Sequence, residues 1–163
     1  MTEEGTIIKV KIADYKVTGK PNILVTNGLG SCVGLSLYDE KLGVGGLAHI
    51  MLPQSKKEVE PRFFPRYADT AIKAIIAELE EQGCNQTDIV AKIAGGASMF
   101  PDLKKDGKGV GERNVEASMG ILAEMKIPLI GSDTGGDYGR SIEFSTITGE
   151  MRIRSIRHGI ITM

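Results

Sequence analysis

Hydrophobic and polar positions alternate with a period of two in several short segments of the chain. Val33, Leu35 and Leu37, for example, are separated by small or polar residues. Such alternation, and short apolar runs bounded by turn residues, predict β-strands that are buried on at least one face. The strands predicted in this way span residues 7–11, 15–17, 23–26, 33–38, 44–52, 89–94, 128–130, 141–146 and 150–155.

A helical period is present in only two segments, residues 66–82 and 112–126. In the first, Ala68, Ala71, Ile72, Ile75, Ile76 and Leu79 form one apolar stripe. In the second, the residues expected to face the core are Val115, Met119, Leu122 and Met125. Because strands outnumber helices and do not alternate regularly with them, the pattern favours an α+β fold over a doubly wound one. Polar or glycine-rich loops are expected at 53–65, 104–111 and 132–139.

Composition narrows the class of protein. The chain has 163 residues, which fits a single domain over 1–163, and its 41% apolar content is too high for a disordered chain. A net charge of −1 argues against a nucleic-acid-binding protein. No apolar run approaches the ~18 residues of a membrane span, and the first residues do not resemble a signal peptide. We therefore expect a cytoplasmic protein that is not itself a membrane protein.

Cys32 is the first candidate for chemistry. It follows a turn-forming run that includes Gly28, Gly30 and Ser31, between two apolar strands. Small residues there let the backbone turn sharply, expose the sulfur and aim N–H groups at an oxyanion. The alternative is an inert, buried cysteine, which is how we interpret Cys84, just beyond a predicted helix end. Two cysteines are too few for a disulfide framework or an all-thiolate zinc site. The sequence also has no P-loop, no complete GxGxxG motif and no cluster of metal ligands, so neither a metal nor a cofactor is expected.

His49 is the natural partner of Cys32. It lies in an otherwise apolar strand, where a histidine is usually a core residue with both nitrogens satisfied. However, a hairpin formed by strands 33–38 and 44–52 would bring Cys32 close to His49. An imidazole beside a thiol can lower the pKa of that thiol and move its proton. His158, by contrast, is expected at the surface.

Several blocks of the sequence together resemble one known family. The segment TNGLGSCV at 26–33 strongly resembles the bacterial chemoreceptor glutamine deamidases of the CheD family. Further blocks at 46–53, 67–71, 91–100, 111–114 and 133–136 follow in the order of that family. The likeness extends from about residue 23 to about residue 154, which is most of the chain.

This resemblance implies a fold and a catalytic site. The family is similar to the catalytic domain of cytotoxic necrotizing factor, which implies mixed β-sheets layered as a sandwich with the two long helices on one side. The family's catalytic cysteine, histidine and threonine fall on Cys32, His49 and Thr26. The backbone N–H groups around Gly30 and Ser31 are candidates for the oxyanion donors.

The resemblance also implies a substrate and partners. The expected activity is deamidation of glutamine side chains to glutamate in the cytoplasmic helical region of chemoreceptors, through a Cys–His thioester, with hydrolysis of glutamate methyl esters as a second activity. The CheC phosphatase is an expected partner, and the protein is expected to be a monomer at chemoreceptor clusters. Candidate residues for the receptor or partner surface are Gly95, Gly96, Ala97, Ser98, Phe100, Gly135 and Gly136.

Two alternatives stay open at this point. In one, the chain is a non-catalytic adaptor that acts by binding a receptor or CheC, with Cys32 buried and inert. In the other, it is a cysteine peptidase or a hydrolase of free amides. Fast alkylation of Cys32 argues against the first, and the mass of a treated receptor separates deamidation from chain cleavage.

Overall fold

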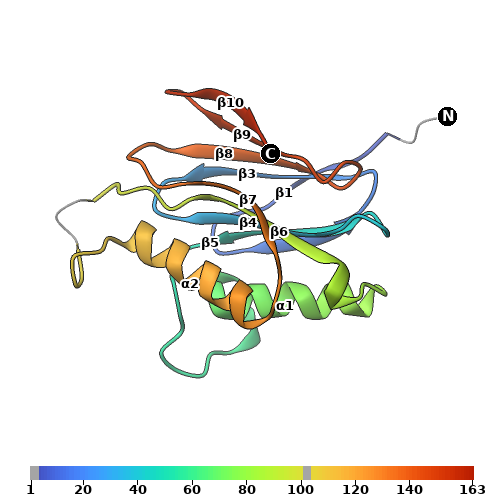
Figure 1. Ribbon diagram of the computed structural model, residues 1–163, viewed down its shortest axis with the longest axis horizontal. Helices are drawn as coiled ribbons and strands as arrows, with labels where there is room; N and C mark the ends of the chain where they lie inside the picture. The colour runs from blue at the N-terminus through green and yellow to red at the C-terminus, as the bar shows by residue number, and fades with distance from the viewer. Residues whose placement is uncertain (1–3, 101–103) are drawn as a thin grey trace.

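Two five-stranded β-sheets pack face to face, and two helices cover the free face of one of them (Figure 1). The structure is a computed structural model that describes residues 4–100 and 104–163. The sheet covered by the helices, here called the central sheet, has the order β2-β5-β4-β6-β7. The other, the outer sheet, has the order β1-β3-β8-β9-β10. The predicted α+β class and the layered arrangement with both long helices on one side are confirmed.

The strands of both sheets are short, and the pairing is mixed. The central sheet contains β2 (Tyr15–Gly19), β4 (Val33–Asp39), β5 (Val44–Ile50), β6 (Ile89–Gly95) and β7 (Leu129–Thr134). The outer sheet contains β1 (Ile7–Lys9), β3 (Ile23–Leu29), β8 (Arg140–Ser145), β9 (Met151–Ser155) and β10 (Gly159–Thr162). β1 pairs with β3 and β6 pairs with β7 in parallel, whereas the other pairs are antiparallel.

The helices are α1 (Ala68–Glu81) and α2 (Val110–Glu124), with short 3-10 turns at Pro61–Arg66 and Gln86–Asp88. All six residues of the predicted stripe on α1 are buried against the central sheet, so this part of the pattern is confirmed. Neither helix, nor any other in the described residues, is long and apolar enough to cross a bilayer.

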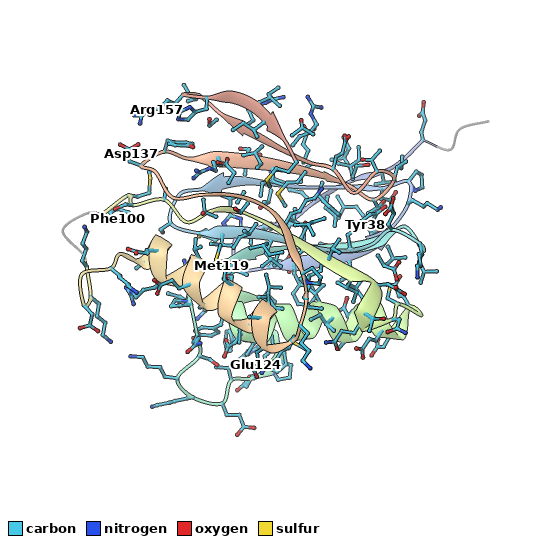
Figure 2. All side chains as sticks on the ribbon, viewed as in Figure 1. Tyr38, Phe100, Met119, Glu124, Asp137 and Arg157 are labelled. Atoms are coloured by element: carbon cyan, nitrogen blue, oxygen red, sulfur yellow. The ribbon has the colours of Figure 1, made fainter. Side chains whose placement is uncertain are left out.

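The prediction for α2 is partly wrong. Val115, Leu122 and Met125 pack against the core as expected, but Met119 is 37% exposed (Figure 2). The fully buried face of the helix instead includes the polar residues Asn114 and Ser118. A hydrophobic period alone cannot find such positions, because polar side chains are buried where they have hydrogen-bond partners.

Several strands differ from their predicted limits, β3 and β7 by the most, and one strand was not predicted. β3 does not end at Thr26 but continues to Leu29, with an irregular register between Thr26 and Leu29 where Gly28 takes a φ of +73°. β7 extends to Thr134, into a predicted loop, because it pairs in parallel with β6. β10 was not predicted. Its residues are exposed throughout, so they show no alternation, and its hydrogen bonds to β9 define it.

Candidate active site

Thr26 and His49 meet in the layer between the two sheets. Thr26 lies on β3 and His49 on β5, and both side chains are buried. The Thr26 hydroxyl donates a hydrogen bond to the carbonyl oxygen of Val10 at 2.7 Å, and its oxygen lies 2.8 Å from His49 Nδ1. The contact therefore joins one residue from each sheet.

This contact fixes the tautomer of His49. A threonine hydroxyl has one proton to donate, and a carbonyl oxygen can only accept. Since the Thr26 proton goes to Val10, the hydrogen bond between Thr26 and His49 must be donated by Nδ1–H. The lone pair of the imidazole is then on Nε2, which is buried and has no hydrogen-bond partner among the described residues. His49 is thus a base whose free nitrogen is not engaged by the protein.

The register of β4 and β5 brings Cys32 to the same face of the central sheet. Gly34 lies directly opposite His49, and Cys32 is two positions before Gly34. Side chains two positions apart along an extended chain point to the same side, and diagonal neighbours across an antiparallel pair lie about 7–8 Å apart. Cys32 is 8% exposed and packs with residues between the sheets. The hairpin therefore brings Cys32 and His49 to one side of the sheet, as predicted from the sequence.

Burial keeps both groups neutral in the free protein. It lowers the pKa of His49 to about 4 and raises the pKa of the Cys32 thiol. No charged neighbour opposes either shift. Of the two states that the sequence left open, thiol with imidazole and thiolate with imidazolium, the surroundings favour the neutral pair.

The turn before Cys32 is held by backbone hydrogen bonds. Gly30 N–H donates to the Gly28 carbonyl at 3.2 Å, and the carbonyls of Gly30 and Cys32 each accept at 2.9 Å from the segment after β6. Gly95 packs against this turn with a φ of +101°, and a Cβ at this position would lie 2.5 Å from the Cys32 carbonyl oxygen. A larger residue would therefore not fit here. In the described part of the chain, the N–H groups of Ser31 and Cys32 have no acceptor. These two amides, rather than that of Gly30, are therefore free to bind an oxyanion.

Comparison with known sequences identifies the family. The family described as "CheD chemotactic sensory transduction" matches residues 51–155. "Chemoreceptor glutamine deamidase CheD" of Bacillus licheniformis is 43% identical over 165 residues, which cover 100% of this chain and 98% of the relative. The chain belongs to the CheD family.

Other members are equally similar. The protein named "Probable chemoreceptor glutamine deamidase CheD" in Caldanaerobacter subterraneus subsp. tengcongensis is 45% identical over 158 residues, covering 96% of this chain and 98% of its own length. A relative of the same name in Haloarcula marismortui is 40% identical over 156 residues, covering 96% of this chain and 89% of its own length. The family match begins at Met51, after Cys32 and His49, so it is these nearly full-length relatives that extend the similarity across the candidate site.

Two solved structures share the fold at low sequence identity. Bacillus licheniformis hypothetical protein YfiH superposes with a TM-score of 0.50 at 18% identity, over 83% of this chain and 61% of that one. Neisseria meningitidis protein NMB0706 superposes with a TM-score of 0.52 at 11% identity, over 81% and 64%. The chain thus spans just under two thirds of each. The likeness to cytotoxic necrotizing factor stays a prediction.

The residues predicted for a partner surface divide into buried and exposed ones. Gly95, Gly96 and Ala97 are buried, so they lie beneath the surface, whereas Ser98, Phe100 and Gly136 are exposed and Gly135 is half-buried. Phe100 is 61% exposed and lies at the same end of the molecule in this view as the ion pair between Asp137 and Arg157 (Figure 2). The accessible part of the predicted surface is therefore formed by the tips of two loops.

The two loops are joined to each other. Gly135 N–H donates to the Gly95 carbonyl at 3.0 Å, and Ser98 N–H donates to the Gly136 carbonyl at 2.8 Å. Gly96, Ser98, Gly135 and Gly136 contribute to the lining of a cavity of about 380 Å³. Ser31, next to Cys32, lines a smaller cavity together with Ser98 and Phe100. Ser98 contributes to both cavities, and the smaller one adjoins the turn that carries the cysteine.

The sequence did not indicate a role for Arg140, which fixes the conformation of the loop between β7 and β8. Its side chain is buried, its Nε lies 3.2 Å from Asp133 Oδ2, and its Nη1 donates to the Gly135 carbonyl at 2.9 Å. The same guanidinium donates to the Tyr138 hydroxyl at 3.0 Å. A buried arginine with this many partners fixes the loop conformation. The only sequence signal was an arginine immediately before a predicted strand, residues 141–146.

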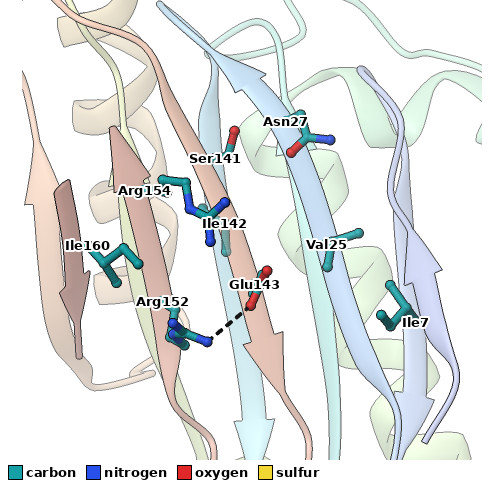
Figure 3. Close-up of a pocket in the computed structure, with 9 residues that line it drawn as sticks. All are labelled: Ile7, Val25, Asn27, Ser141, Ile142, Glu143, Arg152, Arg154 and Ile160. Atoms are coloured by element: carbon teal, nitrogen blue, oxygen red, sulfur yellow. Dashed lines mark ion pairs between the residues drawn. The ribbon is translucent and has the colours of Figure 1, made fainter. Parts of the chain in front are cut away.

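A different cavity, of about 330 Å³, lies on the free face of the outer sheet (Figure 3). Val25 and Asn27 line it from β3, opposite an ion pair of 3.6 Å between Arg152 and Glu143. Thr26 lies between Val25 and Asn27 and points to the other side of the strand, toward His49. This cavity is therefore separated from the Thr26–His49 contact by the outer sheet itself.

Proposed function

We propose that this protein hydrolyses the side-chain carboxamide of glutamine residues in chemoreceptors, with Cys32 as the nucleophile and His49 as the base. The observation that carries the proposal is the contact from Thr26 to His49 Nδ1, which leaves Nε2 free on the face of the sheet that also holds Cys32. The substrate comes from the relatives, which are named chemoreceptor glutamine deamidases. A thiol with a neighbouring base is a suitable nucleophile for the carbonyl carbon of an amide.

In the first half of the reaction, His49 Nε2 takes the thiol proton of Cys32 as the sulfur attacks the carboxamide carbon. The carbonyl oxygen becomes an oxyanion, which the N–H groups of Ser31 and Cys32 would bind. The imidazolium then gives its proton to the amide nitrogen, the C–N bond breaks, and ammonia leaves. The product of this half is a glutamyl thioester on Cys32.

In the second half, neutral His49 takes a proton from a water molecule, and the resulting hydroxide attacks the thioester carbon. The C–S bond breaks, the proton returns to sulfur, and glutamate is released. Thr26 accepts from Nδ1–H through both halves, so it keeps the imidazole in one orientation. The low pKa of His49, about 4, leaves it neutral and available as a base at the start of each half.

The same arrangement would hydrolyse a glutamate methyl ester. The ester presents the same acyl carbon and the same oxygen to the oxyanion donors, and methanol leaves in place of ammonia. We include esterase activity in the proposal for this reason. The CheC phosphatase, where an organism has one, is the proposed protein partner, and the proposed location is the cytoplasm at chemoreceptor clusters.

The decisive experiment uses the cytoplasmic fragment of a chemoreceptor as substrate. The wild-type protein should release ammonia and convert particular glutamines to glutamate, as read by peptide mass spectrometry. Cys32→Ser should keep its circular dichroism spectrum and lose this activity. Deamidation at the wild-type rate by Cys32→Ser would overturn the assignment of the nucleophile, and fragments of the receptor chain would instead indicate a peptidase.

The burial of Cys32 favours a second candidate, a non-catalytic adaptor. In that case the cysteine is a core residue, and the protein acts by binding a receptor or CheC. Iodoacetamide separates the two proposals, because it labels Cys32 quickly when His49 can take its proton and slowly when the thiol is only part of the core. Cys84, which is also buried, provides the internal standard.

Phe100 tests where the partner binds. Its side chain is exposed, so Phe100→Glu should weaken receptor binding and leave alkylation of Cys32 unchanged. Ala97 is unsuitable for the same test, because it is fully buried and a charge there would disturb the fold. Receptor affinity unchanged by Phe100→Glu would remove this loop from the proposed surface.

A further inference from the structure

Asn114 is a fully buried polar residue on α2, the helix that packs beside the candidate site. Its side-chain Nδ2 donates to the Ser31 carbonyl at 2.9 Å and to the Met51 carbonyl at 3.2 Å. Ser31 immediately precedes Cys32, and Met51 lies two positions after His49. One amide group therefore joins the two segments that carry the proposed nucleophile and base.

These two segments have no hydrogen-bonded ladder between them at this point. The pairing of β4 with β5 begins at Val33 and Ile50, so Ser31 and Met51 lie just beyond the last strand pair. Met51 N–H is directed instead to the Arg66 carbonyl at 3.1 Å. Asn114 thus takes the place of the next rung of the ladder, at the end of the sheet where the chemistry is proposed.

A second observation connects this helix turn to the site. Within the described residues, three buried side-chain atoms lack a hydrogen-bond partner, namely His49 Nε2, Asn114 Oδ1 and Arg113 Nε. Most buried polar groups in proteins are paired, and each exception calls for an explanation, of which a catalytic role is one. One exception is the proposed base itself, and the other two are neighbours on the turn of α2 that contacts its segment.

We propose that Asn114 is a positioning residue, which sets the separation of Cys32 from His49 by holding the Ser31 and Met51 carbonyls on one amide group. This inference rests on the proposed function. The Ser31 carbonyl belongs to the same peptide group as the Cys32 N–H. The hydrogen bond from Asn114 therefore also orients this peptide, which provides one of the two proposed oxyanion donors. Asn114 touches no reacting atom in this scheme, and it acts only through the geometry of the two segments.

The test is Asn114→Ala, compared with Ser118→Ala as a matched control. Ser118 lies one turn further along the same helix, is equally buried, and donates to the Asn114 carbonyl at 2.7 Å, with no hydrogen bond to either catalytic segment in the described residues. Receptor deamidation and alkylation of Cys32 are measured per folded molecule, with the folded fraction taken from urea unfolding. Asn114→Ser serves as a second variant should the alanine variant not fold, because its short hydroxyl suits a helix but does not reach both carbonyls.

A positioning role predicts that Asn114→Ala lowers kcat by about 100-fold with KM nearly unchanged, because small displacements of reacting groups are this costly. Alkylation of Cys32 should slow as well, whereas Ser118→Ala should keep both rates. Wild-type rates per folded molecule in Asn114→Ala would overturn the inference and leave a structural role. Activity in Cys32→Ser would instead overturn the proposed function, so the two failures are distinguishable.

Discussion

The two packed layers of this protein differ in what they bury. Between the helices and the central sheet, the buried hydrophobic cluster is aliphatic apart from Cys84, and the buried polar residues of α2, Asn114 and Ser118, lie beside it. Between the two sheets, aliphatic residues are joined by the contact of Thr26 with His49 and by Cys32. The first layer buries mainly apolar side chains, and its buried polar residues on α2 do not titrate, while the second contains a thiol and an imidazole that can exchange protons.

The two cysteines show why burial alone does not reveal chemistry. Both are buried and both thiols have a raised pKa, that of Cys84 reaching about 11. Burial is the largest cause for each, but the carboxylate of Asp39 raises the pKa of Cys84 further. Cys32 instead shares a sheet face with a neutral histidine whose Nε2 is free. The neighbour, rather than the exposure, distinguishes a candidate nucleophile from a core residue.

The substitution expected to lower activity most is His49→Gln, in the layer between the two sheets. Glutamine can fill part of the space but cannot take the Cys32 proton, so kcat for receptor deamidation should fall by about 10²–10⁴-fold. Cys84→Ser, in the layer beneath the helices, should leave the rate within about twofold and lower stability only. Ammonia release measured on both variants checks this, and a comparable loss in Cys84→Ser would erase the distinction between the layers.

Thr26→Val should have the next largest effect. Valine has nearly the same shape but accepts no hydrogen bond, so Nδ1 loses its partner and the imidazole can adopt either tautomer. We expect kcat to fall by about ten- to a hundred-fold while Cys32 stays in place. Imidazole nitrogen chemical shifts should show His49 protonated on Nδ1 in the wild type and a mixture in the variant. An Nε2–H tautomer in the wild type would contradict the assignment.

Alkylation rates compare the two cysteines directly. At neutral pH, iodoacetamide should label Cys32 faster than Cys84 by about an order of magnitude or more, because His49 can take the proton of Cys32 whereas burial and the Asp39 carboxylate hold Cys84 as a thiol. The modified peptides can be counted by mass spectrometry over time. Equal rates in the wild type, or an unchanged Cys32 rate in His49→Gln, would favour the adaptor.

The smallest effect concerns stability against pH. The pKa of His49 falls from 6.5 to about 4 on burial, so the unfolded chain binds the proton more tightly than the folded one. This contribution to stability is complete above pH 6.5 and is lost as the pH falls toward 4, by roughly 3 kcal/mol in total. The free energy of unfolding of the wild type and of His49→Gln can be measured with urea at several pH values. The difference between the two proteins isolates the contribution of His49, because all other groups titrate in both. Parallel curves for the two proteins would show that His49 is not held neutral.

Much of the fold and the core of the site could be predicted from the sequence. The stripe on α1 gave the right buried face, since apolar residues at helical spacing pack against the core. The alternation in β4 correctly predicted a strand but only a half-buried one, whereas β4 is buried on both faces because it lies between the helices and the outer sheet. The predicted hairpin of β4 and β5 placed Cys32 near His49. The limits of β3 and β7 were wrong, and β10 was missed, because those strands depend on pairing partners distant in the sequence.

The sequence by itself determined which elements form, which of their faces are apolar, and which residues are capable of chemistry. Only the tertiary structure decided the state of those residues. The proton on His49 Nδ1 depends on a threonine from the other sheet and on the carbonyl of Val10. The link between the catalytic segments depends on Asn114, a residue distant in the sequence from both. Hydrogen bonds between distant segments have no period along the chain, so they become visible only when the layers are packed together.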